Sequence, residues 1–283
     1  MIGSMPLILA SMPNLSVFQY NIVDNMFSLT VAAMGATAIF LFMSRSMVDE
    51  PYRPALLISG LVVTLAAYHY FMIRYSWQSA YTFKDGGYVG SGAAFNDFYR
   101  YADWILTVPL LMVELISVLR LEKARATSLL TRLVVAAALM IALGYPGEVI
   151  ATPEGWTMRV VWGVLSSIPF FYILFVLWVE LTNSVSSQPP AARKLIEIAR
   201  LVLLVTWAVY PIAYALGGTV EALTAKAGGG ADVDPSGVVY LNIGYAIADI
   251  AAKAGFGMLI YAIARAKSTN VSDYDRQGVP ATA

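Results

Sequence analysis

The chain contains no cysteine, a single histidine and little charge. Without cysteine it can form no disulfide, no thiolate metal site and no cysteine nucleophile. With His69 as the only histidine we also expect no metal site, because protein zinc sites usually need several histidine or cysteine ligands. Only 13% of the 283 residues are charged and the net charge at pH 7 is zero, which argues against nucleic acid as a partner.

Apolar residues dominate instead. They make up 59% of the chain, and its mean hydropathy of +0.67 is too high for a soluble domain of this length. A helix needs about 20 predominantly apolar residues to cross a bilayer. Stretches of this kind lie at 17–44, 54–76, 96–119, 126–145, 153–182, 191–216 and 236–266. The sequence therefore predicts an all-α membrane protein, a seven-transmembrane-helix bundle whose immediate partner is the lipid bilayer.

The connections between these stretches predict two exposed turns and three regions. Residues 77–94 carry glycine-rich turns between aromatic residues, which predicts a short external β-hairpin between the second and third helices. A second turn is expected at 228–235. We expect residues 1–16 to form an external N-terminal extension, 17–267 the seven-helix domain, and 268–283 a polar, disordered cytoplasmic tail.

The distribution of basic residues predicts the orientation. One side of the predicted bundle offers chiefly Lys84 and Lys226. The other side carries Arg45, Arg53, Arg120, Lys123, Arg125, Arg193, Lys194, Arg200, Arg265, Lys267 and Arg276. By the positive-inside rule the second side is cytoplasmic, so the N-terminus is expected outside the cell membrane and the C-terminus inside.

The last apolar stretch contains an ion pair motif, Asp249-Ile-Ala-Ala-Lys253. A carboxylate and an amine one helical turn apart are costly to insert into a membrane, which indicates a function. A desolvated lysine is a competent amine for a carbonyl and can form a Schiff base. The alternative from the residues alone is a helix-gating salt bridge in a transporter.

The third stretch carries a polar stripe. Asp103, Thr107 and Glu114 follow one another at i, i+4 and i+11, close to whole helical turns, so they share one face of the helix. The stripe is about 16 Å long at 1.5 Å per residue, which suits a stepwise proton path. For Glu114 the alternative is a side chain that snorkels to the cytoplasmic end.

Together these motifs resemble those of microbial (type 1) rhodopsins, and most closely the proteorhodopsin and xanthorhodopsin group of outward proton pumps. The resemblance extends from the first helix to the last. It rests on Asp249-x-x-x-Lys253, Arg100-Tyr-x-x-Asp103-Trp104 with Pro109, and Trp207-x-x-Tyr210-Pro211.

The resemblance implies a cofactor and a set of roles. Lys253 would hold all-trans retinal covalently as a protonated Schiff base, with Asp103 as primary counterion and proton acceptor. Asp249 would be the second counterion, and Glu114 the cytoplasmic proton donor. Arg100 would lie on the exit side, and Thr107 would hydrogen-bond near the acceptor. The polyene would be lined by Trp104, Trp207, Tyr210, Pro211 and Tyr214. Ser166 and Ser167 would face the same pocket, although a serine in a membrane helix more often bonds its own backbone.

Three further positions carry finer expectations. Leu111 matches a position where leucine accompanies green absorption in proteorhodopsins, although plain packing is the alternative. Gly163 matches a glycine that opens a window for a carotenoid antenna in xanthorhodopsin-like pumps, so a hydroxylated carotenoid is a candidate second chromophore. The alternative for Gly163 is close packing of helices. A single histidine among aromatic residues is usually a core residue whose ring nitrogens are hydrogen-bonded within the core. For His69, however, the resemblance implies a hydrogen bond to Asp103.

The predicted function is light-driven outward proton transport rather than enzymatic catalysis. Asp103, Thr107 and Glu114 match the proton-pump pattern and not that of sodium or chloride pumps. A sensory photoreceptor that signals to a transducer is one alternative, and it often lacks the donor. A retinal-free secondary transporter is another, and it predicts no visible absorption. Since relatives commonly assemble as trimers or pentamers, we expect a homo-oligomer.

Overall fold

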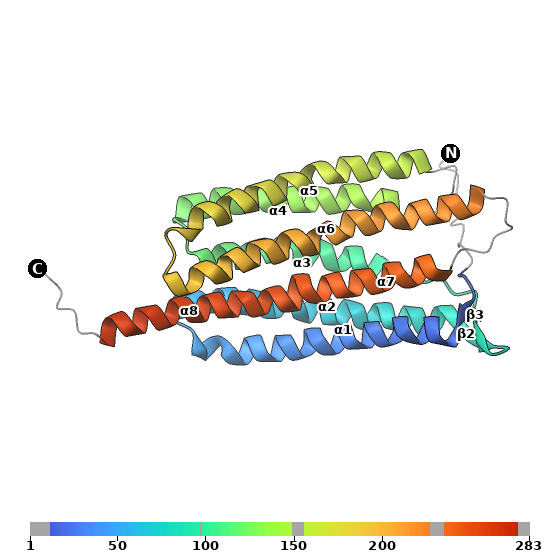
Figure 1. The fold of residues 1–283 in the computed structure, drawn as a ribbon, viewed down its shortest axis with the longest axis horizontal. Helices are drawn as coiled ribbons and strands as arrows, with labels where there is room; N and C mark the ends of the chain where they lie inside the picture. The colour runs from blue at the N-terminus through green and yellow to red at the C-terminus, as the bar shows by residue number, and fades with distance from the viewer. Residues whose placement is uncertain (1–11, 97, 149–155, 227–234, 277–283) are drawn as a thin grey trace, which may run out of the picture.

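A computed structural model describes residues 12–96, 98–148, 156–226 and 235–276. Its helices run side by side along the long axis of the molecule, with a small sheet at one end (Figure 1). Among the described residues, seven helical segments are long and apolar enough to cross a membrane, as predicted. They are α1 (Val17–Met43), α2 (Arg53–Ala80), α3 (Phe98–Leu119), α4 (Lys123–Glu148), α5 (Trp156–Val185), α6 (Pro190–Lys226) and a composite seventh.

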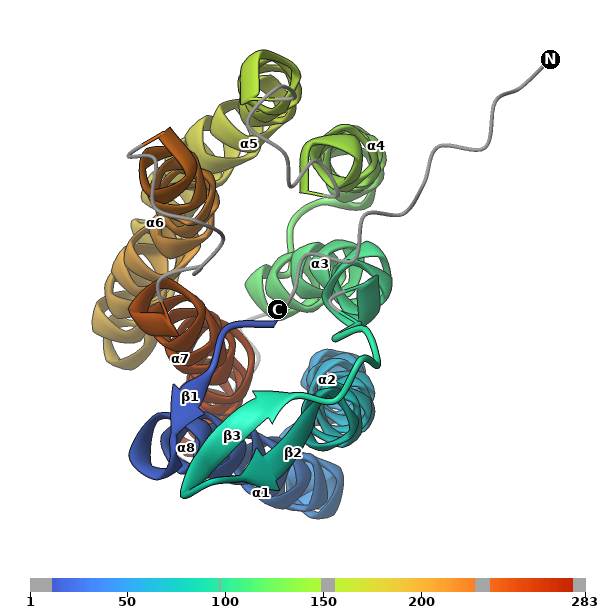
Figure 2. The ribbon, with the colours of Figure 1, turned by 90° about the vertical axis from the view of Figure 1, so that its right-hand side faces the viewer.

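The seventh segment is not one uniform helix. It begins as α7 (Pro235–Asp249), passes through a π-helical stretch, η4 (Ile250–Gly255), and continues as α8 (Phe256–Arg276). Viewed from the sheet end, the helices form a closed ring in which α6 lies between α5 and α7 (Figure 2). The interior of this ring is where side chains from different helices can meet.

The predicted hairpin is confirmed, and it gains a third strand. β2 (Tyr81–Lys84) and β3 (Gly87–Gly90) are antiparallel, joined by Asp85 and Gly86, whose φ angles of 52° and 83° suit a tight hairpin turn. β1 (Leu15–Ser16) pairs with the other edge of β3. Ser16 also caps α1: its hydroxyl accepts from the Gln19 backbone N–H, while Gln19 accepts from that of Ser16. The end of the predicted external extension is therefore part of the sheet, and residues 1–11 lie outside the described residues.

Two helices continue beyond their predicted ends. α6 extends to Lys226 rather than residue 216, and α8 extends to Arg276. The prediction of a disordered tail from residue 268 is therefore wrong for residues 268–276. Hydropathy marks only the apolar part of a helix, whereas a helix once nucleated propagates into polar sequence at little cost. The second predicted turn falls almost wholly within 227–234, outside the described residues.

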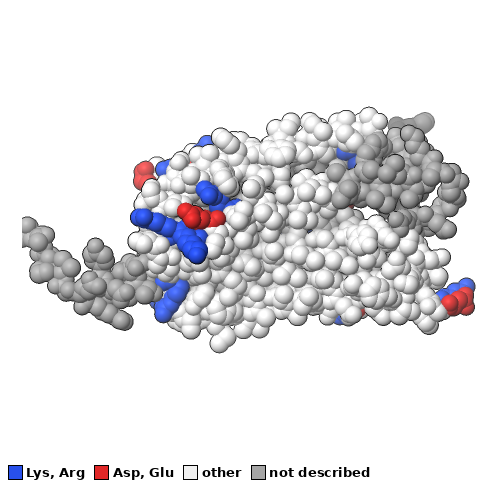
Figure 3. Space-filling model, in the orientation of Figure 1, with Lys and Arg blue, Asp and Glu red and all other residues white. Residues whose placement is uncertain are grey.

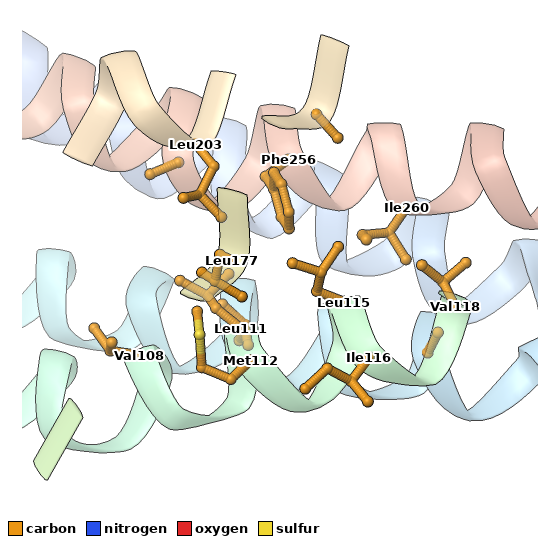
Figure 4. Packing of buried hydrophobic residues seen from close by; sticks show 14 of the residues in the cluster. Val108, Leu111, Met112, Leu115, Ile116, Val118, Leu177, Leu203, Phe256 and Ile260 are labelled. Atoms are coloured by element: carbon orange, nitrogen blue, oxygen red, sulfur yellow. The ribbon is translucent and has the colours of Figure 1, made fainter. Parts of the chain in front are cut away.

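An apolar core lies between the helices. Val108, Leu111, Met112 and Leu115 of α3 meet side chains of α5, α6 and α8 there, including Leu177, Leu203, Phe256 and Ile260 (Figure 4). On the face shown in Figure 3 the middle of the surface is almost free of charged side chains, and basic side chains gather at the end where α8 finishes. Because lipid is as apolar as the core, such helices associate through close packing rather than the hydrophobic effect.

Candidate functional site

Lys253 lies in the π-helical stretch and is almost fully buried, with 2% of its surface exposed. Its Nζ donates to Asp103 Oδ2 at 2.7 Å and to Asp249 Oδ1 at 2.6 Å. Asp103 comes from α3 and Asp249 from the end of α7, so the two carboxylates meet the amine from two helices. Single π-helical turns are rare and frequently occur at functional sites.

Two tyrosines fix the Asp249 carboxylate. The Tyr70 hydroxyl donates to Oδ2 at 2.7 Å, and the Tyr210 hydroxyl donates to Oδ1 at 2.5 Å. Together with Lys253 these make three hydrogen bonds to one side chain, contributed by α2, α6 and η4. Hydrogen bonds to an ionised carboxylate are shorter and stronger than neutral ones, so this arrangement suits a permanent anion.

Asp103 has looser surroundings. Thr107 Oγ1 lies 3.4 Å from Asp103 Oδ2 and donates more closely, at 2.9 Å, to the Asp103 carbonyl. His69 Nδ1 lies 3.3 Å from Asp103 Oδ1 and 3.0 Å from the Leu65 carbonyl. The structure thus brings His69 and Asp103 into contact, but among the described residues no hydrogen bond to Oδ1 is completed. The predicted bond between the pair stays a prediction.

Arg100 lies one turn before Asp103 on α3 and is buried. Its Nη2 donates to Asn242 Oδ1 at 2.6 Å, and its guanidinium carbon lies 5.2 Å from the centre of the Tyr245 ring. Both partners come from α7. The guanidinium is therefore held on the sheet side of the lysine cluster, where a cation stabilises the nearby carboxylates.

Glu114 lies further along α3, away from the sheet, within the apolar core. Only 1% of its surface is exposed, so it does not snorkel to the membrane surface. The Ser59 hydroxyl of α2 is close enough to influence the charge of Glu114. Neither oxygen of the Glu114 carboxylate, however, completes a hydrogen bond with a described residue. A carboxylate in such surroundings is costly when ionised, which suits a group that holds and releases a proton.

A cavity of about 360 Å³ extends from Lys253. Its volume falls in the range of small-molecule sites. The cavity wall includes every residue expected near the chromophore: Trp104, Leu111, Gly163, Ser166, Ser167, Trp207, Tyr210, Pro211 and Tyr214. Much of the remaining wall comes from α4 and α5. An apolar cavity with one lysine amine in its wall fits a long hydrophobic aldehyde, which is the chemistry of retinal.

The sequence model of the family described as "Bacteriorhodopsin-like protein" matches residues 21–267. The chain belongs to this family of microbial rhodopsins. Members bind retinal through a lysine Schiff base. Lys253 is the lysine of this rhodopsin that lines the cavity.

Individual relatives agree with the predicted group. The rhodopsin is 28% identical over 245 residues to the green-light absorbing proteorhodopsin of Gamma-proteobacterium EBAC31A08, covering 86% of this chain and 87% of that one. The crystal structure of thermophilic rhodopsin is similar with a TM-score of 0.83 and 48% identity. The structure of xanthorhodopsin, "a light-driven ion pump with dual chromophore", is similar with a TM-score of 0.82 and 45% identity. Each covers 92% of this chain, which covers 99% of each.

The position of the Tyr214 side chain explains why residues 147 and 163 are glycines. A Cβ atom at Gly163 would lie 2.8 Å from Tyr214 Cε1, and one at Gly147 would collide with the Tyr214 hydroxyl. Both glycines are therefore needed for the present position of the tyrosine ring. This supports close packing as a reason for Gly163. Ser166 donates to the Met140 carbonyl of α4 at 2.7 Å, whereas Ser167 bonds within its own helix, to the Gly163 carbonyl.

Sequence reasoning missed three members of the site: Tyr70, Asn242 and Arg159. Tyr70 follows His69 directly, and adjacent helix residues do not point in the same direction, so both were not expected in one site. In the structure His69 contacts Asp103 and Tyr70 contacts Asp249. Asn242 lies two turns before Asp249, a spacing that could have placed it on the same face of α7. Arg159 gave no such signal, because its partners lie on other elements.

Proposed function

We propose that this rhodopsin is a light-driven outward proton pump that carries all-trans retinal as a protonated Schiff base on Lys253. The observation that carries the proposal is the amine of Lys253 held between Asp103 and Asp249, with a third buried carboxylate, Glu114, further along the same helix as Asp103. A buried cation beside two anions keeps its proton in the dark.

When bound, retinal supplies the light-driven isomerisation that disturbs this balance. Asp103 is then the acceptor of the proton, since it touches the amine and is less firmly hydrogen-bonded than Asp249. Asp249, fixed by Tyr70 and Tyr210, stays as the second counterion. Arg100 stabilises the negative charge on the exit side. Glu114 returns a proton from the cytoplasmic side, and Thr107 and His69 orient the Asp103 carboxylate.

A sensory photoreceptor remains the second candidate, because its fold and chromophore would be the same. The buried donor, Glu114, favours the pump. A retinal-free transporter is disfavoured by membership of a retinal-binding family and by the cavity at Lys253.

We also propose a hydroxylated carotenoid as a second chromophore at Gly163. The proposal is supported by the 45% identity to xanthorhodopsin, whose structure carries two chromophores, and by the position of Gly163 in the cavity wall. Adding the carotenoid should produce energy transfer in the excitation spectrum of the retinal band, and Gly163→Trp should abolish it. A spectrum unchanged by the carotenoid would overturn this second proposal. Leu111 in the same wall supports green absorption.

The proposed orientation and assembly apply to the whole chain. Residues 1–16 face the outside of the cell membrane, 17–267 form the retinal-binding domain, and 268–283 lie in the cytoplasm. The protein assembles in the bilayer as a homo-oligomer, a trimer or a pentamer.

The decisive experiment measures the pH of an unbuffered suspension of retinal-fed cells under green light, with and without a protonophore. We expect acidification that the protonophore abolishes. Lys253→Ala should give neither colour nor a pH change. Coloured cells without a pH response would favour the sensory photoreceptor, and alkalinisation that the protonophore abolishes would reverse the proposed direction.

A further inference from the structure

Arg159 is a buried cation in the wall of the same cavity as Lys253, with 7% of its surface exposed. It belongs to α5, whereas Lys253 belongs to the segment that continues α7. Because α6 lies between α5 and α7 (Figure 2), the two cations approach the cavity from different sides. A buried charge in a membrane protein is costly and is kept where it has a role.

Hydrogen bonds to two neighbouring helices fix the position of this charge. Arg159 Nη1 donates to the carbonyls of Gly147 and Glu148, at 3.0 and 3.2 Å, where α4 ends. Nη2 donates to the Tyr214 carbonyl of α6 at 3.2 Å, and the Tyr214 hydroxyl donates back to the Arg159 carbonyl at 2.8 Å. The guanidinium carbon also lies 4.4 Å from the centre of the Tyr214 ring. The cation therefore cannot turn away from the cavity without breaking contacts to α4 and α6.

Among the described residues, Glu148 supplies a carboxylate next to this cation. Glu148 Oε2 lies 3.4 Å from Arg159 Nη2, and Glu148 is absent from the cavity wall while Arg159 is part of it. The ligand of the cavity consequently meets the positive member of the pair at closer range than the negative one. Their fields at the ligand oppose each other, and the nearer charge dominates.

We propose that the Arg159–Glu148 pair sets the colour of the light that this rhodopsin absorbs. The inference rests on the proposed retinal site. In a protonated Schiff base the positive charge lies near the nitrogen in the ground state and spreads along the conjugated chain on excitation. With the nitrogen at Lys253, that charge moves toward the α5 side of the cavity. Arg159 opposes this movement and shifts absorption to shorter wavelength, and Glu148 favours it and shifts absorption to longer wavelength.

The test compares absorption maxima of the purified, retinal-loaded protein with those of single variants. Arg159→Gln should absorb at longer wavelength and Glu148→Gln at shorter wavelength. Coulomb's law at an effective dielectric constant of about 20 makes the first shift roughly 5–10 nm, with a smaller second shift. Arg159→Lys keeps the charge and should stay near the wild-type maximum. As matched controls, Arg125→Gln and Glu180→Gln remove the charges of a remote α4–α5 pair, joined at 2.7 Å, and should shift nothing.

A purely structural role for the pair predicts a different pattern. Loosening of Tyr214 would move the maxima of Arg159→Gln, Arg159→Lys and Glu148→Gln in the same direction, and that result would overturn the inference while leaving the retinal site intact. If Arg159→Gln does not fold, Glu148→Gln still decides: an unshifted or longer-wavelength maximum contradicts the inference. A wild type without any visible band would overturn the proposed function as well.

Discussion

Three buried carboxylates of this rhodopsin have the same chemistry and different surroundings. Asp249 accepts hydrogen bonds from two tyrosines and a lysine, whereas Asp103 touches the lysine, a threonine and a histidine. Glu114 lies in apolar packing without a completed hydrogen bond among the described residues. Since a carboxylate is stabilised as an anion by donors and as a neutral acid by their absence, the three surroundings suit a fixed anion, an acceptor and a donor.

The proposed donor role of Glu114 predicts a kinetic effect. Glu114→Gln should slow the recovery of ground-state absorption after a light flash by roughly 100-fold, because a positioned acid contributes about 10²–10⁴-fold to a proton transfer. The absorption maximum should change little, since Glu114 is not part of the cavity wall. Flash photolysis measures the recovery, and the exposed Glu122→Gln is the matched control. Equal recovery in both variants would exclude Glu114 as the donor.

The contact between His69 and Asp103 predicts that the histidine affects the acid colour transition. Because the two side chains are in contact, His69→Ala should shift the midpoint of this transition. The measurement is an absorption titration of the purified protein in the dark. A midpoint unchanged in His69→Ala would mean that the ring bonds only to the Leu65 carbonyl, from which its Nδ1 lies 3.0 Å.

Helical spacing within single segments could identify most of these site residues. Asp103, Thr107 and Glu114 lie on one helix, and Asp249 and Lys253 lie one turn apart in the last helical segment. Such spacing could not identify Tyr70 as a partner of Asp249, or Arg159 as part of the cavity. Those contacts join different helices, and they depend on how the helices are rotated about their axes. Helical periodicity in one segment carries no information about the rotation of its neighbour.

At the scale of the elements, the end of α3 is stabilised from another helix. Lys267 of α8 is buried, and its Nζ donates to the last carbonyls of α3, those of Val118 and Leu119, at 2.9 and 3.3 Å. A helix ends with carbonyls that have no partner in the helix itself, and a cation there also interacts favourably with the helix dipole. Lys267 therefore connects the end of α3 to α8, the helix that continues from the π-helical stretch containing Lys253.

Removing this amine should destabilise the protein. Lys267→Met keeps much of the side-chain volume but removes the donor from the Val118 carbonyl and leaves the Leu119 carbonyl only a long contact, 3.5 Å, with Gln188 Nε2. We expect this to cost about 1–2 kcal/mol. We expect a lower temperature for thermal loss of the visible band at a fixed heating rate. Lys194→Met, which changes an exposed lysine of α6, is the control and should leave this temperature unchanged. If both variants lose colour at the wild-type temperature, the Lys267 contacts do not contribute to stability.

The elements themselves were predictable where one physical signal dominates. Apolar length located all seven helices, and glycine with aromatic residues located the hairpin. The third strand was not predictable, since Leu15 and Ser16 form only two residues of strand and depend on β3 for their hydrogen bonds. The π-helical stretch around Lys253 was not predictable from the local sequence either, because its hydrogen-bond pattern depends on packing inside the ring.

At the scale of the whole molecule, charge separates the two ends. Basic side chains gather at the end where α8 finishes, and the middle of the face shown in Figure 3 is almost free of charged side chains. The opposite end carries the sheet, with Lys84 in β2. This polarity agrees with the positive-inside rule and supports an external sheet, so that α3 runs from Arg100 outside toward Glu114 inside. The proposed outward direction of proton transport depends on this orientation, and a reversed orientation would contradict it.

The absence of cysteine makes the orientation directly measurable, because any introduced cysteine is the only thiol in the chain. Thr82 in β2 and Ser186 between α5 and α6 are both exposed and close to cysteine in size. A membrane-impermeant maleimide should label Thr82→Cys on intact spheroplasts, and Ser186→Cys only after permeabilisation. The wild type should stay unlabelled throughout. The reverse pattern would place the sheet in the cytoplasm, and Glu114 would then lie on the external side of the lysine, where it could not return protons from the cell interior.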